Sequence, residues 1–112
     1  MMELNKGDIC IVDFNPAKGG EIGKLRPAII LSQNEDNKIL DTTIVIPLST
    51  VIEPDAKPYR VLIKKREKLQ KDSDACIYEI RALSKARIKE KIARLSKDEI
   101  KVIKECLCDI IG

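Results

Sequence analysis

The residues best suited to chemistry stand at the ends of two predicted strands. Arg26 directly precedes the apolar run 27–31 (PAIIL), and Ser49 directly follows the β-branched run 42–48 (TTIVIPL). Glu21 lies just upstream of Arg26, in a glycine-containing segment. If the two strands are neighbours in a sheet, a permanent cation, a hydroxyl and a carboxylate converge at one edge. Such a set suits a phosphodiester, because arginine binds phosphate oxygens bidentately and stabilises developing charge, while a carboxylate moves a proton.

The same residues also have an ordinary structural explanation. An arginine before a proline at a strand start is commonly a surface residue. Ser49 with Thr50 after a strand is a common pair of turn hydroxyls. Structural charge networks are far commoner than active sites. The spacing of Arg26 and Ser49 therefore suggests a catalytic site but is not specific for one.

The absence of histidine excludes several kinds of nuclease and metal site. A His-based triad, a paired-histidine nuclease and a His-ligated metal site all need a residue that the sequence lacks. No second cluster of carboxylates accompanies Arg26 and Ser49, which disfavours a two-metal nuclease. The natural alternative without a metal or another cofactor is RNA cleavage by the RNA's own 2′-hydroxyl.

The cysteines do not form a metal or redox motif. No C-x-x-C pair exists among Cys10, Cys76, Cys106 and Cys108, so neither a zinc ribbon nor a thioredoxin-type site fits. We expect them to be small apolar side chains in a reducing cytoplasm. The first residues lack the apolar core of an export signal, which also favours a cytoplasmic location.

Length and composition predict one folded domain over residues 1–112. The hydrophobic fraction of 44% is enough for a core, and the net charge of +3 permits a nucleic-acid partner without proving one. Aromatic residues make up 3% of the chain, too few for the stacking platforms of common single-strand binding domains. No apolar run approaches the roughly 20 residues of a membrane span, so no membrane partner is expected.

Short strands followed by one helix are the predicted elements. The expected strands lie at 9–14, 27–31, 42–48, 59–63, 75–80 and 91–95, with a polar turn at 33–38 and one helical turn at 83–88. Ser96 and Glu99 form an S-x-x-E capping box, and isoleucines and leucines then recur at three- and four-residue steps up to Ile111. The spacing predicts an α+β fold, mainly β, in which a small antiparallel barrel carries a C-terminal helix.

Two further features bear on binding. The segment 15–25 contains three glycines and two lysines but no P-loop motif, and predicts a surface loop between strands. Basic residues are concentrated at 57–71 and 85–97. These two segments either line a groove that follows a phosphate backbone or form an ordinary solvated face.

The sequence resembles the MazF/PemK-like toxins over nearly its whole length. The resemblance rests on KGDI at the start, on DFNP, on GEIGKLRPA and on TTIVIPLST, and continues in YEIRALSKARI and in the C-terminal LSKDEIKVIKECLCDIIG. The most specific part is the segment G-x-E-x-x-x-x-R-P, which is followed about twenty residues later by a strand ending in Ser49.

The resemblance implies an SH3-like barrel that forms a homodimer. It also implies a metal-independent endoribonuclease without a cofactor, which cuts single-stranded RNA at short sequences. A small antitoxin inhibits it, and the two proteins together bind DNA. Arg26 falls on the family's catalytic arginine, Ser49 on a position where many members carry threonine, and Glu21 on a loop glutamate implicated in some members. Two residues stay open as the general base. Chemistry favours Glu21, because an arginine with a pKa above about 12 is a poor base, whereas the resemblance favours Arg26.

The candidates for binding RNA combine the resemblance with the basic segments. They are Lys18, Lys24, Thr50, Arg60, Glu79 and Arg81. Glutamine is common in the family where this chain has Glu79. Two other functions stay open: a non-catalytic gyrase poison of the CcdB type on the same fold, and a catalytically inactive nucleic-acid-binding module. A gyrase poison has no need to keep the pair Arg26 and Ser49.

Overall fold

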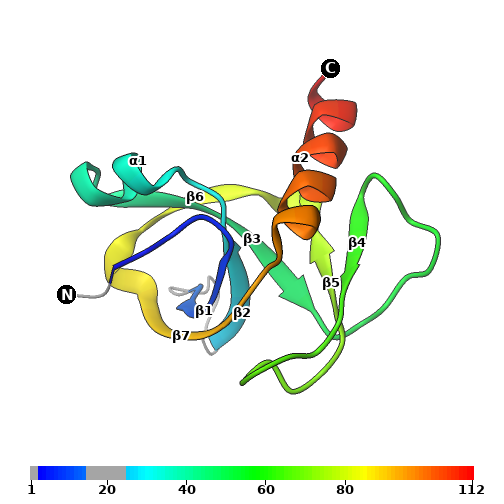
Figure 1. Ribbon diagram of the computed structural model, residues 1–112, viewed down its shortest axis with the longest axis horizontal. Helices are drawn as coiled ribbons and strands as arrows, with labels where there is room; N and C mark the ends of the chain where they lie inside the picture. Colours follow the sequence, from blue (N-terminus) through cyan, green and yellow to red (C-terminus); the bar gives the residue numbers. More distant parts are fainter. Residues whose placement is uncertain (1–2, 15–24) are drawn as a thin grey trace, which may run out of the picture.

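The computed structural model describes residues 3–14 and 25–112 of the chain. The elements in chain order are β1 (Asp8–Asp13), β2 (Leu25–Ile30), α1 (Asn34–Ile39), β3 (Thr42–Ser49), β4 (Arg60–Ile63), β5 (Ser73–Cys76), the 3-10 turn η1 (Ile77–Glu79), β6 (Arg81–Ser84), the 3-10 turn η2 (Lys85–Arg87), β7 (Ile88–Arg94) and α2 (Lys97–Ile111) (Figure 1).

All strand pairs among the described residues are antiparallel. The strands follow the order β4-β5-β3-β2-β1-β7, and β6 pairs with β3 alongside β5. The predicted α+β class with a C-terminal helix is confirmed. The sheet is not closed into a full barrel, however, because no ladder joins β4 and β7 at its two ends. A single backbone bond, from Lys68 N to Ile92 O (2.9 Å), connects the segment after β4 to β7.

The sheet is buried on both faces, which explains its nearly continuous apolar strands. Ile9 and Ile29 point into one core cluster, whereas Cys10, Ala28 and Val45 point into the other, as alternate strand residues must. We name these the helix-side core and the far-side core, because α2 packs against the first. Figure 1 shows α2 standing beside β3 and β5 on that side.

The C-terminal helix begins as the sequence predicts. Ser96 Oγ accepts from Glu99 N (3.1 Å) and Glu99 Oε1 accepts from Ser96 N (2.8 Å), which completes the capping box. Ile103 and Cys106 are buried in the helix-side core. Ile111, which we expected on the buried face, is 75% exposed because the last turn extends past the sheet.

The predicted polar turn at 33–38 is instead helix α1. Its Asn37 is buried, and the Nδ2 of Asn37 donates to the carbonyls of Leu4 (3.3 Å) and Ser32 (3.1 Å). The Oδ1 of Asn37 accepts from Thr43 Oγ1 (2.9 Å). A polar side chain that is satisfied inside the fold gives no apolar periodicity, so the pattern could not reveal this helix.

Two other predicted elements differ in type. The expected strand 75–80 starts earlier, at Ser73, and ends at Cys76, where η1 takes over. The expected helical turn 83–88 is divided among the end of β6, η2 and the first residue of β7. In both places a short strand passes directly into a 3-10 turn, and runs this short carry little periodic signal.

Candidate functional site

Arg26 and Ser49 lie at the same end of two paired strands. β2 and β3 pair with Ala28 opposite Pro47, and continuing this register by two residues brings Arg26 opposite Ser49. Directly opposed residues in an antiparallel pair point to the same face of the sheet. That face is the one on which Ala28 and Val45 enter the far-side core. The structure therefore brings these two predicted site residues together.

The side chain of Arg26 is exposed and has no polar partner among the described residues. Its neighbour on β1 is the buried Val12, which offers it no polar group. Within residues 3–14 and 25–112, the Arg26 guanidinium makes no hydrogen bond or ion pair. Because arginine is permanently charged, such a side chain is available to an anion from solvent.

Ser49 is half-buried, and its hydroxyl oxygen is already an acceptor. Val51 N donates to Ser49 Oγ over 3.1 Å, which forms a side-chain turn at the end of β3. The hydroxyl hydrogen remains available for donation to another acceptor, such as a phosphate oxygen. On its other side, Ser49 pairs with Asp74 of β5.

Thr50 lies on the opposite face from Ser49. It lines a cavity of about 220 Å³ together with Ile11 and Pro27, which point to the helix side of the sheet. Lys68 and Lys71 line the same cavity. Thr50 therefore cannot present its hydroxyl to the place that Ser49 reaches, although the two residues are adjacent in the chain.

Arg81 and Glu79 form a polar pair on the same side as Ser49. Arg81 pairs with Val45, so its side chain emerges on the far-side face, where the guanidinium carbon lies 5.2 Å from the centre of the Phe14 ring. Arg81 Nη2 lies 3.5 Å from Glu79 Oε1, and both side chains are about half exposed. Val12, two residues before Phe14, pairs with Arg26, so Arg26 and Arg81 both approach the end of β1.

The guanidinium of Arg60 is already engaged in hydrogen bonds and ion pairs within the protein. Its Nη1 donates to the carbonyl of Val51 (2.9 Å) and to Asp74 Oδ2 (3.5 Å), and its Nε lies 3.4 Å from Glu53 Oε2. Arg60 retains 22% side-chain exposure, while Asp74 retains 2%. The predicted RNA-binding arginine is thus the cation of a structural network. Asp74, its partner, was missed because a single acidic residue before a predicted strand gives no signal.

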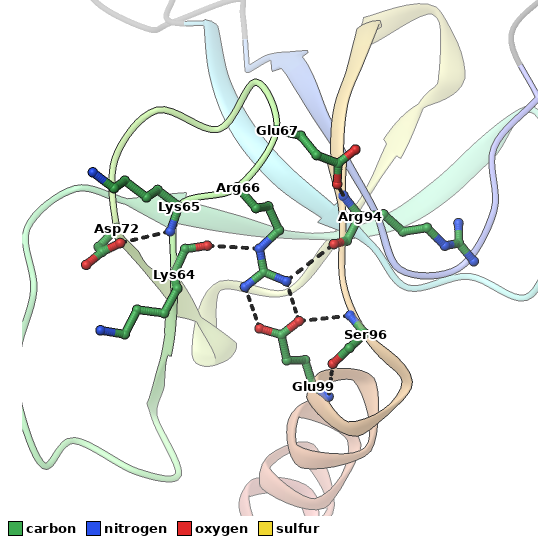
Figure 2. A network of polar contacts seen from close by, with 8 residues as sticks. All are labelled: Lys64, Lys65, Arg66, Glu67, Asp72, Arg94, Ser96 and Glu99. Carbon is green, nitrogen blue, oxygen red and sulfur yellow. Dashed lines mark hydrogen bonds and ion pairs between the residues drawn. The ribbon is translucent and has the colours of Figure 1, made fainter.

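Part of the first basic segment, 57–71, is also structural. Arg66 forms a two-point ion pair with Glu99 at the start of α2, where one of the two contacts, Nη2 to Oε2, measures 2.6 Å (Figure 2). Arg66 further donates to the carbonyls of Lys64 (2.9 Å) and Arg94 (3.3 Å). The hydrogen bond from Arg66 lowers the pKa of the Glu99 carboxyl. This network joins the segment after β4 to the capping box of α2.

The buried cysteines are poor nucleophiles. Burial raises the pKa of Cys10 to about 12, and it also raises the pKa of Cys76 and Cys106. Cys108 is exposed, unlike the apolar core residue that we expected there. In the described parts of the chain, no group of three acidic, cysteine or histidine residues is arranged to hold a metal ion. No helix there is long and apolar enough to cross a membrane.

Three predicted site residues lie outside the described residues. They are Lys18, Glu21 and Lys24, which belong to the segment between β1 and β2.

The chain is similar to toxins of one family. A family model described as "PemK-like, MazF-like toxin of type II toxin-antitoxin system" matches residues 5–111. A curated relative named Endoribonuclease MazF, from Staphylococcus saprophyticus, is 34% identical over 110 residues, covering 97% of this chain and 92% of the relative.

Solved structures agree with the fold. The MazE-MazF crystal structure (Form-II) from Deinococcus radiodurans matches with a TM-score of 0.83 and 19% identity, covering 100% of this chain and 98% of that chain. The Mycobacterium tuberculosis toxin MazF-mt6 matches with a TM-score of 0.77 and 17% identity over 93% and 95% of the two chains. The family match over residues 5–111 and the 34% identical relative establish that this chain belongs to the PemK-like, MazF-like toxins of type II toxin–antitoxin systems.

Proposed function

We propose that this protein is a toxin that cleaves single-stranded RNA at short sequences, through attack by the RNA's own 2′-hydroxyl and without a cofactor. The observation that carries the proposal is the exposed guanidinium of Arg26, which has no hydrogen bond or ion pair to any described residue and lies across from Ser49 when the β2–β3 register is continued. The curated relative is named an endoribonuclease, and the family is one of toxins. A gyrase poison is not favoured, because the relatives are MazF toxins.

The chemistry of the site follows from the charges that develop at phosphorus. The ribose 2′-oxygen attacks the adjacent phosphorus, the bond to the 5′-oxygen breaks, and the products are a 2′,3′-cyclic phosphate and a 5′-hydroxyl. Arg26 binds the non-bridging oxygens and stabilises their added charge, while Ser49 donates one hydrogen bond to them. Glu21 accepts the 2′-hydroxyl proton, and a proton reaches the departing 5′-oxygen from solvent.

The nucleotides flanking the cut need further contacts. We assign these to Lys18, Lys24 and Arg81 as cations, with Glu79 as an acceptor for the exocyclic amines of bases. The 5.2 Å contact between Arg81 and the Phe14 ring holds the guanidinium plane near the end of β1, where a base can stack on it. Thr50 faces the other side of the sheet. It could therefore contact RNA only on that side, at the cavity that it lines together with Lys68 and Lys71.

The antitoxin is the expected protein partner. One structural relative is titled an endoribonuclease in complex with its cognate antitoxin, and others are MazE-MazF complexes. By analogy, an acidic segment of an antitoxin would occupy the Arg26 face and exclude RNA, since both ligands are polyanions. The toxin–antitoxin complex would then bind DNA. One domain over residues 1–112 and a cytoplasmic location fit this role.

A homodimer remains part of the proposal, on different grounds from those the sequence suggested. Most apolar residues of β2 and β3 do not need a second subunit, because Ile29, Ile30 and Ile46 are fully buried, although Leu25 and Ile44 are 63% and 42% exposed. Other exposed apolar groups lie outside these two strands: Tyr59 and Tyr78, 56% and 72% exposed, contact each other edge to face with ring centres 6.3 Å apart. Light scattering at micromolar concentration should give twice the monomer mass.

The experiment that tests the function uses purified protein and mixed RNA in EDTA. We expect discrete cuts at one short sequence, with a terminal cyclic phosphate on each upstream fragment. The Arg26→Ala variant serves as the control for a contaminating nuclease. Intact RNA with folded wild-type protein, or cuts that persist in the variant, would refute the proposed function.

A further inference from the structure

We propose that Arg60 and Asp74 are positioning residues that set the direction of the Ser49 hydroxyl, and that Arg60 compensates the buried charge of Asp74. The inference rests on the proposed function, in which Ser49 donates to the scissile phosphate. It assigns Arg60 to the interior of the site rather than to RNA binding.

The first observation is the row of side chains across the sheet. Ser49 pairs with Asp74, and Asp74 pairs with Leu62 of β4. Arg60 stands two residues before Leu62, so its side chain emerges on the same face as Asp74 and Ser49. Continuing the β2–β3 register adds Arg26 to this row on the other side of Ser49. The direct cross-strand neighbour of Ser49, the residue with the proposed catalytic hydroxyl, is therefore a buried aspartate.

The second observation is that the backbone of one residue, Val51, connects Arg60 to Ser49. Val51 N donates to Ser49 Oγ (3.1 Å), while the carbonyl of Val51 accepts from Arg60 Nη1 (2.9 Å). Asp74 Oδ2 accepts from Glu53 N (2.8 Å) and fixes the next part of the turn. Val51 is itself 65% exposed, so packing of its side chain does little to hold this turn. These hydrogen bonds hold the turn at Val51 in place. This turn fixes the Val51 N–H that donates to the oxygen of the Ser49 hydroxyl.

The third observation is electrostatic. Asp74 is 2% exposed, so its charge is poorly screened by solvent. The Arg60 guanidinium, 3.5 Å away, supplies the opposite charge. Without Arg60, an uncompensated carboxylate would lie next to the position of an incoming phosphate. Such a charge repels the transition state more strongly than the ground state, because negative charge on the phosphoryl oxygens increases along the reaction.

The main test is a double-mutant cycle between Arg60→Gln and Ser49→Ala. Single-turnover cleavage gives the rate of the chemical step, and filter binding to an uncleavable 2′-deoxy RNA gives the affinity. Arg60→Gln should slow cleavage by about 10-fold when Ser49 is present and by a clearly smaller factor in the Ser49→Ala background, where only the charge of the unpaired Asp74 still acts. Its affinity for RNA should stay within about 2-fold of wild type, since the site retains its other contacts.

A second variant isolates the charge effect. Adding Asp74→Asn to Arg60→Gln removes the uncompensated carboxylate and should restore part of the lost rate. If Arg60→Gln fails to fold, the cleavage rate of the single variant Asp74→Asn can be measured in its place. A readout independent of activity is amide exchange at Val51, which should be faster in Arg60→Gln because one anchor of that turn is lost.

Arg66→Gln is the matched control, because it likewise removes a guanidinium that is paired with a carboxylate, here Glu99 at the start of α2. It should lower stability and leave the single-turnover rate unchanged at temperatures where it is folded. Equal rate losses in both Ser49 backgrounds, or a loss of RNA affinity that accounts for the rate, would overturn the inference and return Arg60 to RNA binding. A Ser49→Ala variant that cleaves at the wild-type rate would overturn the proposed role of Ser49 itself, a result distinguishable from failure at Arg60.

Discussion

Arg26 and Ser49 oppose each other at the open end of the β2–β3 ladder, with their side chains on the same face of the sheet. The two strands are held in this register by Ile29 and Ile46, which are fully buried in the helix-side core. A slip of one residue would move either side chain to the other face and exchange the residues that fill the two cores. The register of the core therefore fixes the geometry of the candidate site.

Arg26→Ala should reduce the cleavage rate by at least about 10²-fold, the scale of losing one charge-stabilising donor. Folding should be unaffected, because this guanidinium makes no hydrogen bond or ion pair within the described residues. Arg26→Lys should give an intermediate rate, since lysine keeps the charge and loses bidentate geometry. Single-turnover assays with a thermal melt of each variant provide the measurement. A folded alanine variant with an unchanged rate would remove Arg26 from the mechanism.

Ser49→Ala should impair cleavage, whereas Ser49→Thr should not, because threonine supplies the same hydroxyl. The control is Thr50→Ala, which removes a hydroxyl from the next residue in the chain. It should have little effect on the chemical step, since Thr50 faces the cavity with Ile11 and Pro27. If both variants at position 49 lose equal activity, packing rather than hydrogen bonding explains the effect. A large loss in Thr50→Ala would contradict the opposite placement of the two hydroxyls.

The ion pair between Arg66 and Glu99 should make stability pH-dependent. Its hydrogen bonds lower the pKa of Glu99 in the folded state. The group therefore stabilises the fold above its unfolded pKa of about 4.3, and this contribution is lost as the pH falls through the lower folded value. Glu99→Gln should cost about 1–3 kcal/mol at pH 7, as expected for charged hydrogen bonds.

Urea unfolding of wild type and Glu99→Gln at several pH values measures this effect. The difference between the two proteins should shrink as the pH falls below about 4. Glu90→Gln is the matched control, because Glu90 and its partner Lys68 are exposed and 3.4 Å apart. It should change stability by less than about 1 kcal/mol. A pH-independent difference for Glu99→Gln would show that its charge is not the cause.

Gly7→Ala should destabilise the protein by about 1–3 kcal/mol or more. Gly7 has a φ of +93°, and an added Cβ would lie 2.6 Å from Ile100 Cδ1. Its backbone also joins two elements, since Gly7 N donates to Ile30 O and Leu95 N donates to Gly7 O, each over 2.8 Å. Gly112→Ala is the control, because φ is +95° there but nothing lies within 4 Å. Similar losses of stability at both positions would exclude the contact with Ile100 as the cause.

Strands β1 to β4 and helix α2 were predictable because their signals are local. The run 42–48 is apolar and β-branched, and the capping box of Ser96 and Glu99 is complete within four residues. Helix α1 was not predictable, because its buried residue, Asn37, is polar and depends on Leu4 and Thr43 for its partners. The position of η1 was missed for a similar reason, since the chain from Ile77 onward is held by Tyr59 and α2.

The candidate site was predictable in part. Arg26 and Ser49 stand at strand ends, so their convergence required only that the two strands pair. The role of Asp74 could not be read from the sequence, because it depends on Arg60 and on the turn at Val51, which are remote from it in the chain. The separation of Ser49 and Thr50 onto opposite faces was implicit in strand alternation, provided that β3 stays extended to its last residue.

Replacing one ribose by deoxyribose tests the central claim most directly. An RNA oligonucleotide that carries the cleavage sequence is prepared with a single deoxyribose immediately 5′ of the cut, and both oligonucleotides are incubated with the protein in EDTA. Because the missing 2′-hydroxyl is the proposed nucleophile, the substituted RNA should bind nearly as well as the all-ribose RNA and remain uncut. The all-ribose RNA should yield a 2′,3′-cyclic phosphate and a 5′-hydroxyl. Cleavage of the deoxy-substituted RNA at the same bond would contradict the account.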